Sequence, residues 1–162
     1  VNNAGINHWV EFEDLDAMTD ELWDRILGIN LKGPWLCAKA VAPIMKRQQR
    51  GRIVSVASIA GIRPAGSSIA YSVAKAGVIH LTRCLAVALA PHVLVNAVAP
   101  GLMEGTGMTV NLAQHFIDGT KKDSLLGRSA DLDDVAAQVV AFARSDTITG
   151  QTLPVDAGIV FP

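Results

Sequence analysis

Residues 52–58 read RIVSVAS, a short run rich in β-branched side chains that is typical of a buried strand. The next ten residues, 59–68, are rich in Gly, Pro and Ser, which predicts a loop. Apolar residues from Ile69 to about Ala90 predict a helix, which Pro91 ends, and Val93 to Ala99 form a second strand before Pro100-Gly101. A strand, a helix and another strand in this order predict two parallel strands with the helix packed across them.

The segments on either side continue this alternation. Val1 to Gly5 looks like the end of a strand running into a turn, and Thr19 suits the cap of a long helix with Asp20 and Glu21 in its first turn. The remaining predicted elements are this helix to about Arg50-Gly51, a mobile flap with a short helix at Leu102 to Ser129, a helix from Asp131 to about Arg144 and a strand from Thr152 to Asp156. The pattern predicts an α/β fold with a parallel sheet and helices on both faces, in one domain covering residues 1–162.

The composition favours a globular protein without a nucleic-acid or membrane partner. Half of the 162 residues are apolar, and the net charge of −1 comes from acids and bases that are interspersed. The most apolar stretch, Cys84 to Met103, contains His92, Asn96 and two prolines, so we expect no membrane span. No charged segment followed by an apolar one opens the chain, so no secretory signal is expected.

The cysteines and histidines predict neither a disulfide nor a metal site. Cys37 and Cys84 fall in helical patterns without metal-like spacing, which predicts buried free thiols and fits a cytoplasmic location. The histidines show no matched ligand spacing, so we expect no metal. His8 and Trp9 follow the turn at Gly5 and could face a substrate or simply pack as a loop pair.

Three side chains suggest proton-transfer chemistry. Tyr71 and Lys75 are four residues apart in a predicted helix and so share one face, and Ser58 ends the preceding strand. An ammonium beside a phenol favours the ionised phenol, which would move its pKa from about 10 toward the working pH. The Ser58 hydroxyl could hold a substrate oxygen next to Tyr71. The triplet therefore predicts interconversion of alcohols and ketones.

Together with other motifs, this triplet resembles the short-chain dehydrogenase/reductase family. The matching elements, in the family's order and at similar spacing, are Asn2-Asn3-Ala4-Gly5, Asn30, Ser58, Tyr71-x-x-x-Lys75 and Pro100-Gly101. The resemblance covers nearly the whole chain. It implies a Rossmann-like, doubly wound sheet that binds NAD or NADP, and an oxidoreductase that moves hydride between the nicotinamide and a ketone or secondary alcohol.

The resemblance also implies a role for each site residue. Tyr71 would be the general acid/base, Lys75 would lower its pKa and hold the nicotinamide ribose, Ser58 would orient the substrate oxygen, and Asn30 would maintain a water-linked proton path. The expected cofactor-binding residues are Asn3, Ala4, Gly5, Tyr71, Lys75, Pro100, Gly101 and Met103. From the residues themselves, Pro34 lacks an N–H and so would leave the Asn30 carbonyl, four residues back, free to bind water.

Some of the family's features are missing or altered. Its Gly-rich phosphate loop and first βαβ units belong upstream of Asn2, so the chain looks like a catalytic half that lacks about 80–90 residues. The family's Thr after Pro-Gly is displaced, with Gly105 in its place and Thr106 next. An alternative function is a catalytically silent fragment or assembly subunit without the cofactor-binding half.

The expected partners are a small ketone or alcohol substrate and further copies of the chain. The long helix from Thr19 and the helix from Ile69 resemble the family's subunit-contact helices, so a homodimer or homotetramer is expected. The sequence does not identify the substrate, because the flap after Gly101 and the loop after Ser58 carry no charged group that we can assign to it. It does not decide between NAD and NADP either, because the residue that reads the adenosine ribose is expected upstream.

Overall fold

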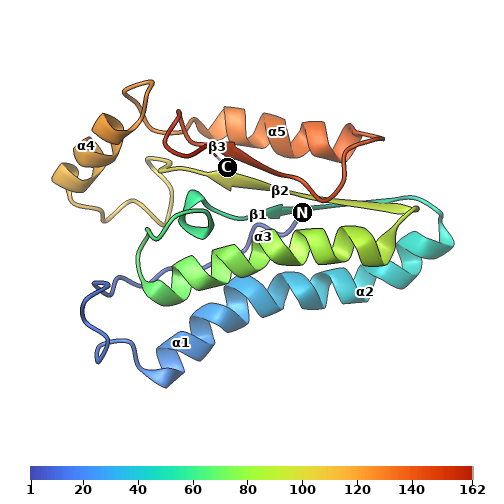
Figure 1. Cartoon of the computed structure of the whole chain (residues 1–162), viewed down its shortest axis with the longest axis horizontal. Coiled ribbons are helices and arrows are strands. Elements are labelled where there is room, and N and C mark those ends of the chain that lie inside the picture. The colour runs from blue at the N-terminus through green and yellow to red at the C-terminus, as the bar shows by residue number, and fades with distance from the viewer. Residues whose placement is uncertain (162) are drawn as a thin grey trace.

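The computed structural model describes residues 1–161, which form a parallel three-stranded sheet with helices on both faces (Figure 1). The strands are β1 (Gly51–Val56), β2 (Val93–Pro100) and β3 (Thr152–Val155), in the order β1-β2-β3. On the outer edge of β1, Asn2 forms a parallel bridge to Ser55, with its N–H donating to the Val54 carbonyl at 2.8 Å. This bridge confirms that the first residues end a strand.

Figure 1 shows the α1–α2 helix and α3 on one side of the sheet and α5 on the other, while α4 lies beyond the end of β2. The helical elements are α1 (Asp20–Leu27), a π-helical turn η1 (Gly28–Lys32), α2 (Gly33–Arg47), a 3-10 turn η2 (Ile59–Gly61), α3 (Ile69–Leu89), α4 (Gln114–Asp123) and α5 (Leu132–Arg144). The arrangement confirms the expected α/β fold with a doubly wound parallel sheet.

The core has one layer on each face of the sheet because neighbouring strand residues point to opposite sides. On one face Ile53 packs against Leu85 of α3, and on the other Val54 packs against Val135 and Phe142 of α5. Full burial of such a side chain contributes about 1.5–3 kcal/mol. These layers fix α3 and η2 at the end of β1, where the candidate site forms.

The long first helix differs from its prediction in two places. A π-helical turn, η1, interrupts it immediately before Pro34, and the Gly33 N–H donates to the Gly28 carbonyl, five residues back. Pro34 has no N–H for the usual bond to the carbonyl four residues earlier, which accounts for the irregularity. The helix ends at Arg47 rather than near Arg50, because Gln49 turns the chain with φ of 52°.

Helix α3 is the one described helix whose length and apolar composition would suffice to cross a membrane. One face of it packs into the core: Ala74 and Val78 are 0% and 1% exposed, and the helix carries the buried polar residues Lys75 and Thr82. Gly77 allows close packing on η1, because a Cβ there would lie 2.7 Å from the Leu31 side chain. The helix is therefore a packing element of the sheet.

The prediction that both cysteines are buried was wrong. Cys37 and Cys84 are free but exposed, on α2 and α3. Both helices are apolar on faces that no other described part of the chain covers, so helical periodicity alone did not distinguish the inner face from the outer one. The large apolar side chains exposed on these two helices are Trp35, Leu36, Ile44, Val73 and Val87.

Candidate active site

Ser58 and Tyr71 are brought together by two short capping structures. Ser58 follows β1 and caps η2, with its Oγ accepting the Ala60 N–H at 3.1 Å. Ser68 caps α3 in the same way, accepting the Tyr71 N–H at 3.3 Å. The Ser72 hydroxyl then ties the two elements together by donating to the Ala60 carbonyl at 2.6 Å. The loop between β1 and α3 therefore places the Ser58 hydroxyl beside the Tyr71 phenol.

The acidity of Tyr71 differs from the expectation. Burial raises the pKa of the phenol, and a hydrogen bond with the Ser58 side chain offsets only part of this rise. The expected lowering by Lys75 is not found: burial and the Ser58 side chain are the causes of the shift, and the ammonium lies over the ring, 5.6 Å from its centroid. In this structure Tyr71 is a protonated phenol near neutral pH.

Lys75 is buried close to Tyr71, and only 4% of it is exposed. Its Nζ donates to the Val56 carbonyl at the end of β1, at 2.9 Å, and burial lowers its pKa to about 8. That carbonyl is the one hydrogen-bond partner of the ammonium among the described residues, so two further N–H groups remain for a ligand. This donor set fits the ribose hydroxyls of a nicotinamide dinucleotide.

Asn30 anchors the N-terminal turn to the first helix. Its side chain is buried, accepts the Ile6 N–H at 3.3 Å and donates to the carbonyls of Ile6 and Ile26 at 2.8 and 3.0 Å. A Cβ at Gly5 would lie 2.8 Å from Asn30 Oδ1 and 3.8 Å from Lys75 Nζ. The turn thus approaches Asn30 and Lys75 closely because residue 5 has no side chain. The proton-path role of Asn30 stays a prediction.

The other expected cofactor-binding residues lie at the same end of the sheet. Asn3 and Ala4 are exposed beside Gly5, Pro100 ends β2 and Gly101 follows it. The Met103 side chain packs into the core under α5, so its backbone is the part expected to touch the cofactor. Its carbonyl accepts the Thr109 hydroxyl at 2.7 Å and the Thr106 hydroxyl at 3.3 Å. The Thr106 hydroxyl therefore forms its hydrogen bond within the flap, the segment from Leu102 to Ser129.

A cavity of about 500 Å³ lies between residues 7–11 and the flap. Its lining includes His8, Trp9, Met108, His115 and Phe116. Met108 also reaches the turn at Gly5, because its Cε would lie 3.2 Å from a Cβ there. Sequence reasoning raised His8 and Trp9 without deciding their role, and no signal in the sequence pointed to Met108 or Phe116.

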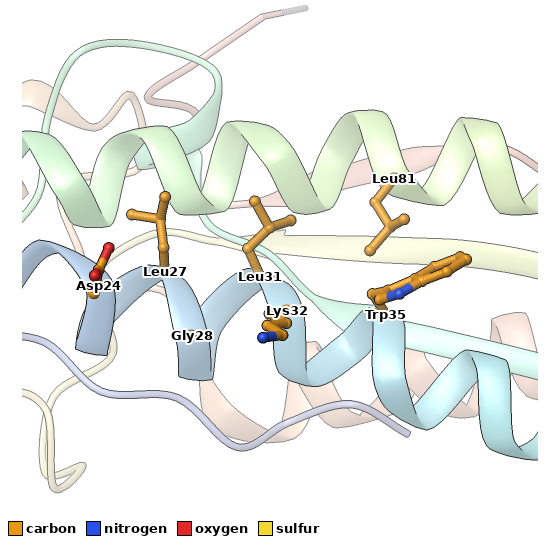
Figure 2. Close-up of a pocket in the computed structure, with 7 residues that line it drawn as sticks. All are labelled: Asp24, Leu27, Gly28, Leu31, Lys32, Trp35 and Leu81. Atoms are coloured by element: carbon orange, nitrogen blue, oxygen red, sulfur yellow. The ribbon is translucent and has the colours of Figure 1, made fainter.

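A second hollow lies outside the candidate active site, between the α1–α2 helix and α3. Figure 2 shows Leu27 and Leu31 directed toward α3, with Leu81 directed back toward Trp35. The lining is completed by Asp24, Gly28 and Lys32. Among residues 1–161, no group of three or more His, Cys, Asp or Glu side chains is placed to hold a metal ion.

Comparisons with known proteins agree with this geometry. A family model described as enoyl-(acyl carrier protein) reductase matches residues 1–160. A protein of Streptomyces violaceoruber described as ketoacyl reductase 2 of the granaticin polyketide synthase is 43% identical over 98% of this chain and 64% of its own length. The 3-oxoacyl-(acyl carrier protein) reductase FabG of Thermotoga maritima is 39% identical over 99% of this chain and 65% of its own length.

The fold comparison gives the same result. A crystal structure from Burkholderia xenovorans, described as a short-chain dehydrogenase/reductase, matches with a TM-score of 0.84 and 28% identity, over 98% of this chain and 65% of that chain. The present chain spans just under two thirds of the length of these relatives. The family model, the relatives and the arrangement of Ser58, Tyr71 and Lys75 lead to one conclusion: the chain belongs to the short-chain dehydrogenase/reductase family.

Proposed function

We propose that the polypeptide carrying this chain is an NAD(P)-dependent oxidoreductase that interconverts a ketone and a secondary alcohol. The observation that carries the proposal is the grouping of a half-buried phenol, a half-buried hydroxyl and a buried ammonium at the end of β1, formed by Tyr71, Ser58 and Lys75. The relatives named above are reductases of ketoacyl substrates by their descriptions, which supports the same class of reaction.

The residues have distinct tasks in the proposed reaction. A bound nicotinamide dinucleotide supplies hydride to the carbonyl carbon in reduction and accepts it in oxidation. Tyr71 gives its proton to the carbonyl oxygen in reduction and takes it back from the alcohol in oxidation. Ser58 donates a hydrogen bond to the same oxygen and stabilises the negative charge that develops there. Lys75 holds ribose hydroxyls with the two N–H groups that Val56 leaves free.

The raised pKa of Tyr71 keeps the phenol protonated near neutral pH, the form that reduction requires. A phenol that is protonated near neutral pH is ready to act as an acid, whereas oxidation requires the phenolate as a base. Asn30 supports the site by holding the Gly5–Ile6 turn against Lys75. We include in the proposal that the Asn30 carbonyl, within the π-helical turn, takes part in resupplying the proton.

The test uses the native full-length polypeptide, with its length checked by intact mass. Purified protein is mixed with NADH or NADPH and a set of ketones, and consumption of the reduced dinucleotide is followed together with alcohol formation. We expect consumption that depends on the ketone and yields one alcohol per dinucleotide. Absence of both dinucleotide binding and ketone reduction would refute the proposal and favour a catalytically silent subunit.

We also propose that the enzyme forms a homodimer or homotetramer through α2 and α3. Trp35 and Leu36 on α2, with Val73 and Val87 on α3, expose between 43% and 83% of their surface. A second copy of the same helices would cover these apolar side chains, and closed homo-oligomers usually use such self-complementary faces. Light scattering after size exclusion should give a dimer or tetramer for the native protein and a smaller species for Val87→Asp. A monomeric native protein would contradict this assembly.

A further inference from the structure

The flap and the segment after the N-terminal turn are joined by a specific set of contacts around the cavity between them. The rings of Trp9 and Phe116 meet edge to face, with centroids 5.1 Å apart. Asn7 Nδ2 donates to the Met108 carbonyl at 3.1 Å, which fixes the flap backbone over the turn. The Trp9 indole N–H donates to Glu11 at 2.7 Å, which holds the indole in place. Two segments about a hundred residues apart in the chain therefore form the two walls of one pocket.

Met108 joins this pocket to the turn at Gly5. It is one of the residues that line the pocket, and its methyl group would lie 3.2 Å from a Cβ at Gly5, which would itself lie 3.8 Å from Lys75 Nζ. The side chain is flexible, and it is one of the residue types that adapt to the shape of a ligand. A substrate whose carbonyl reaches Tyr71 would thus extend past Met108 toward Trp9 and Phe116.

We propose that this pocket selects neutral ketones that carry a planar apolar group, such as an aryl ring, with Trp9 and Phe116 as the specificity-determining residues. The inference rests on the proposed function, because it concerns the substrate of the same site. Trp9 remains 43% exposed after pairing with Phe116, which leaves ring surface for a substrate. Aromatic groups prefer edge-to-face and offset contacts of this kind.

The charges around the pocket disfavour an anionic substrate. Among the described residues that line it, none is a lysine or an arginine. The one carboxylate in the lining, that of Glu11, would repel an anion and already accepts the Trp9 indole N–H. The remaining polar groups are amides and imidazoles, including Asn111, His8 and His115, which can bind a hydroxyl or a second carbonyl.

The kinetic test compares three ketones on the native full-length enzyme: acetylnaphthalene, butanone and the anionic levulinate. We expect the highest kcat/KM for acetylnaphthalene and the lowest for levulinate. In Trp9→Ala and Phe116→Leu, the kcat/KM of acetylnaphthalene relative to butanone should fall about tenfold, since one aromatic contact is worth about one power of ten in affinity. The control Val110→Ala changes an exposed flap residue outside the pocket lining and should leave this ratio unchanged.

A binding test separates this inference from the proposed function. Acetylnaphthalene should quench the tryptophan fluorescence of the native protein with saturation, and Trp9→Phe should lose the saturable part, because Trp23 and Trp35 belong to α1 and α2. Saturable quenching without reduction of any ketone would refute the proposed function, while the inference that the pocket binds a planar apolar group would stand. The pocket inference would be overturned if the enzyme reduced ketones but the kcat/KM of acetylnaphthalene relative to butanone stayed the same in Trp9→Ala and Phe116→Leu. A preference of the native enzyme for levulinate would also overturn it. Absence of both quenching and reduction would overturn both.

Discussion

Replacement of Gly5 by alanine tests how closely the N-terminal turn approaches the catalytic residues. The added Cβ would lie 2.8 Å from Asn30 Oδ1 and 3.2 Å from the Met108 methyl group. Met108 can move away because the contact involves the end of a flexible side chain. Asn30 cannot move as easily, because it is buried and its amide makes three hydrogen bonds to the carbonyl and N–H of Ile6 and the carbonyl of Ile26.

The expected cost has two sources. Overpacking of a filled site costs about 1–3 kcal/mol, and a buried amide that loses a partner costs about 1–3 kcal/mol. A loss of about 2 kcal/mol corresponds to a fall in Tm of about 4–8 °C for a domain of this size. The matched control is Gly119→Ala in α4, where no atom lies within 4 Å of the new Cβ. Thermal unfolding of the native protein and both variants can be followed by circular dichroism, and Gly5→Ala alone should have a lower Tm. Equal Tm values for Gly5→Ala and the native protein would refute the reasoning.

Two further predictions concern Lys75 and Pro34. Folding lowers the pKa of Lys75 from 10.5 to about 8, so between these pH values the folded state binds fewer protons than the unfolded state. The contribution of Lys75 to the free energy of unfolding therefore rises across this range by on the order of 3 kcal/mol. Urea unfolding without dinucleotide should show this rise, and Lys75→Met should remove it; identical pH profiles would contradict burial of the ammonium. Pro34→Ala supplies an N–H to the Asn30 carbonyl, so we expect a more regular helix at residues 28–32 and slower ketone reduction, measured by crystallography and turnover. A variant with the π-helical turn and the rate both unchanged would show that Pro34 does not expose that carbonyl.

Local signals predicted the elements that carry the site. Helix α3 begins and ends within one residue of its predicted limits, because Ser68 caps it and Pro91 lies just beyond its end. Asp131 caps α5 as its position indicated, accepting the N–H groups of Asp133 and Asp134. The four-residue spacing of Tyr71 and Lys75 predicted that both lie on one face of α3. The position of Ser58 after β1 was also predicted, from the β-branched run that ends there.

Features that depend on long-range packing were not predictable in the same way. The i,i+4 spacing of Tyr71 and Lys75 indicated their proximity but not that the ammonium would lie over the ring, nor that burial would raise the pKa of the phenol. The pairing of Trp9 with Phe116 joins segments whose local sequences show no relation. Exposure of Cys37 depends on which face of α2 is covered, and periodicity defines a face without identifying its partner.

The central claim is that the Tyr71 phenol exchanges the proton of the substrate oxygen. The most direct measurement is the rate of ketone reduction by native full-length enzyme carrying Tyr71→Phe, together with the dissociation constant for the dinucleotide. The substitution removes one oxygen atom and keeps the ring that Lys75 contacts. We predict a rate lower by a factor on the order of 10²–10⁴ with nearly unchanged dinucleotide affinity. A variant that reduces ketones at the native rate would contradict the claim.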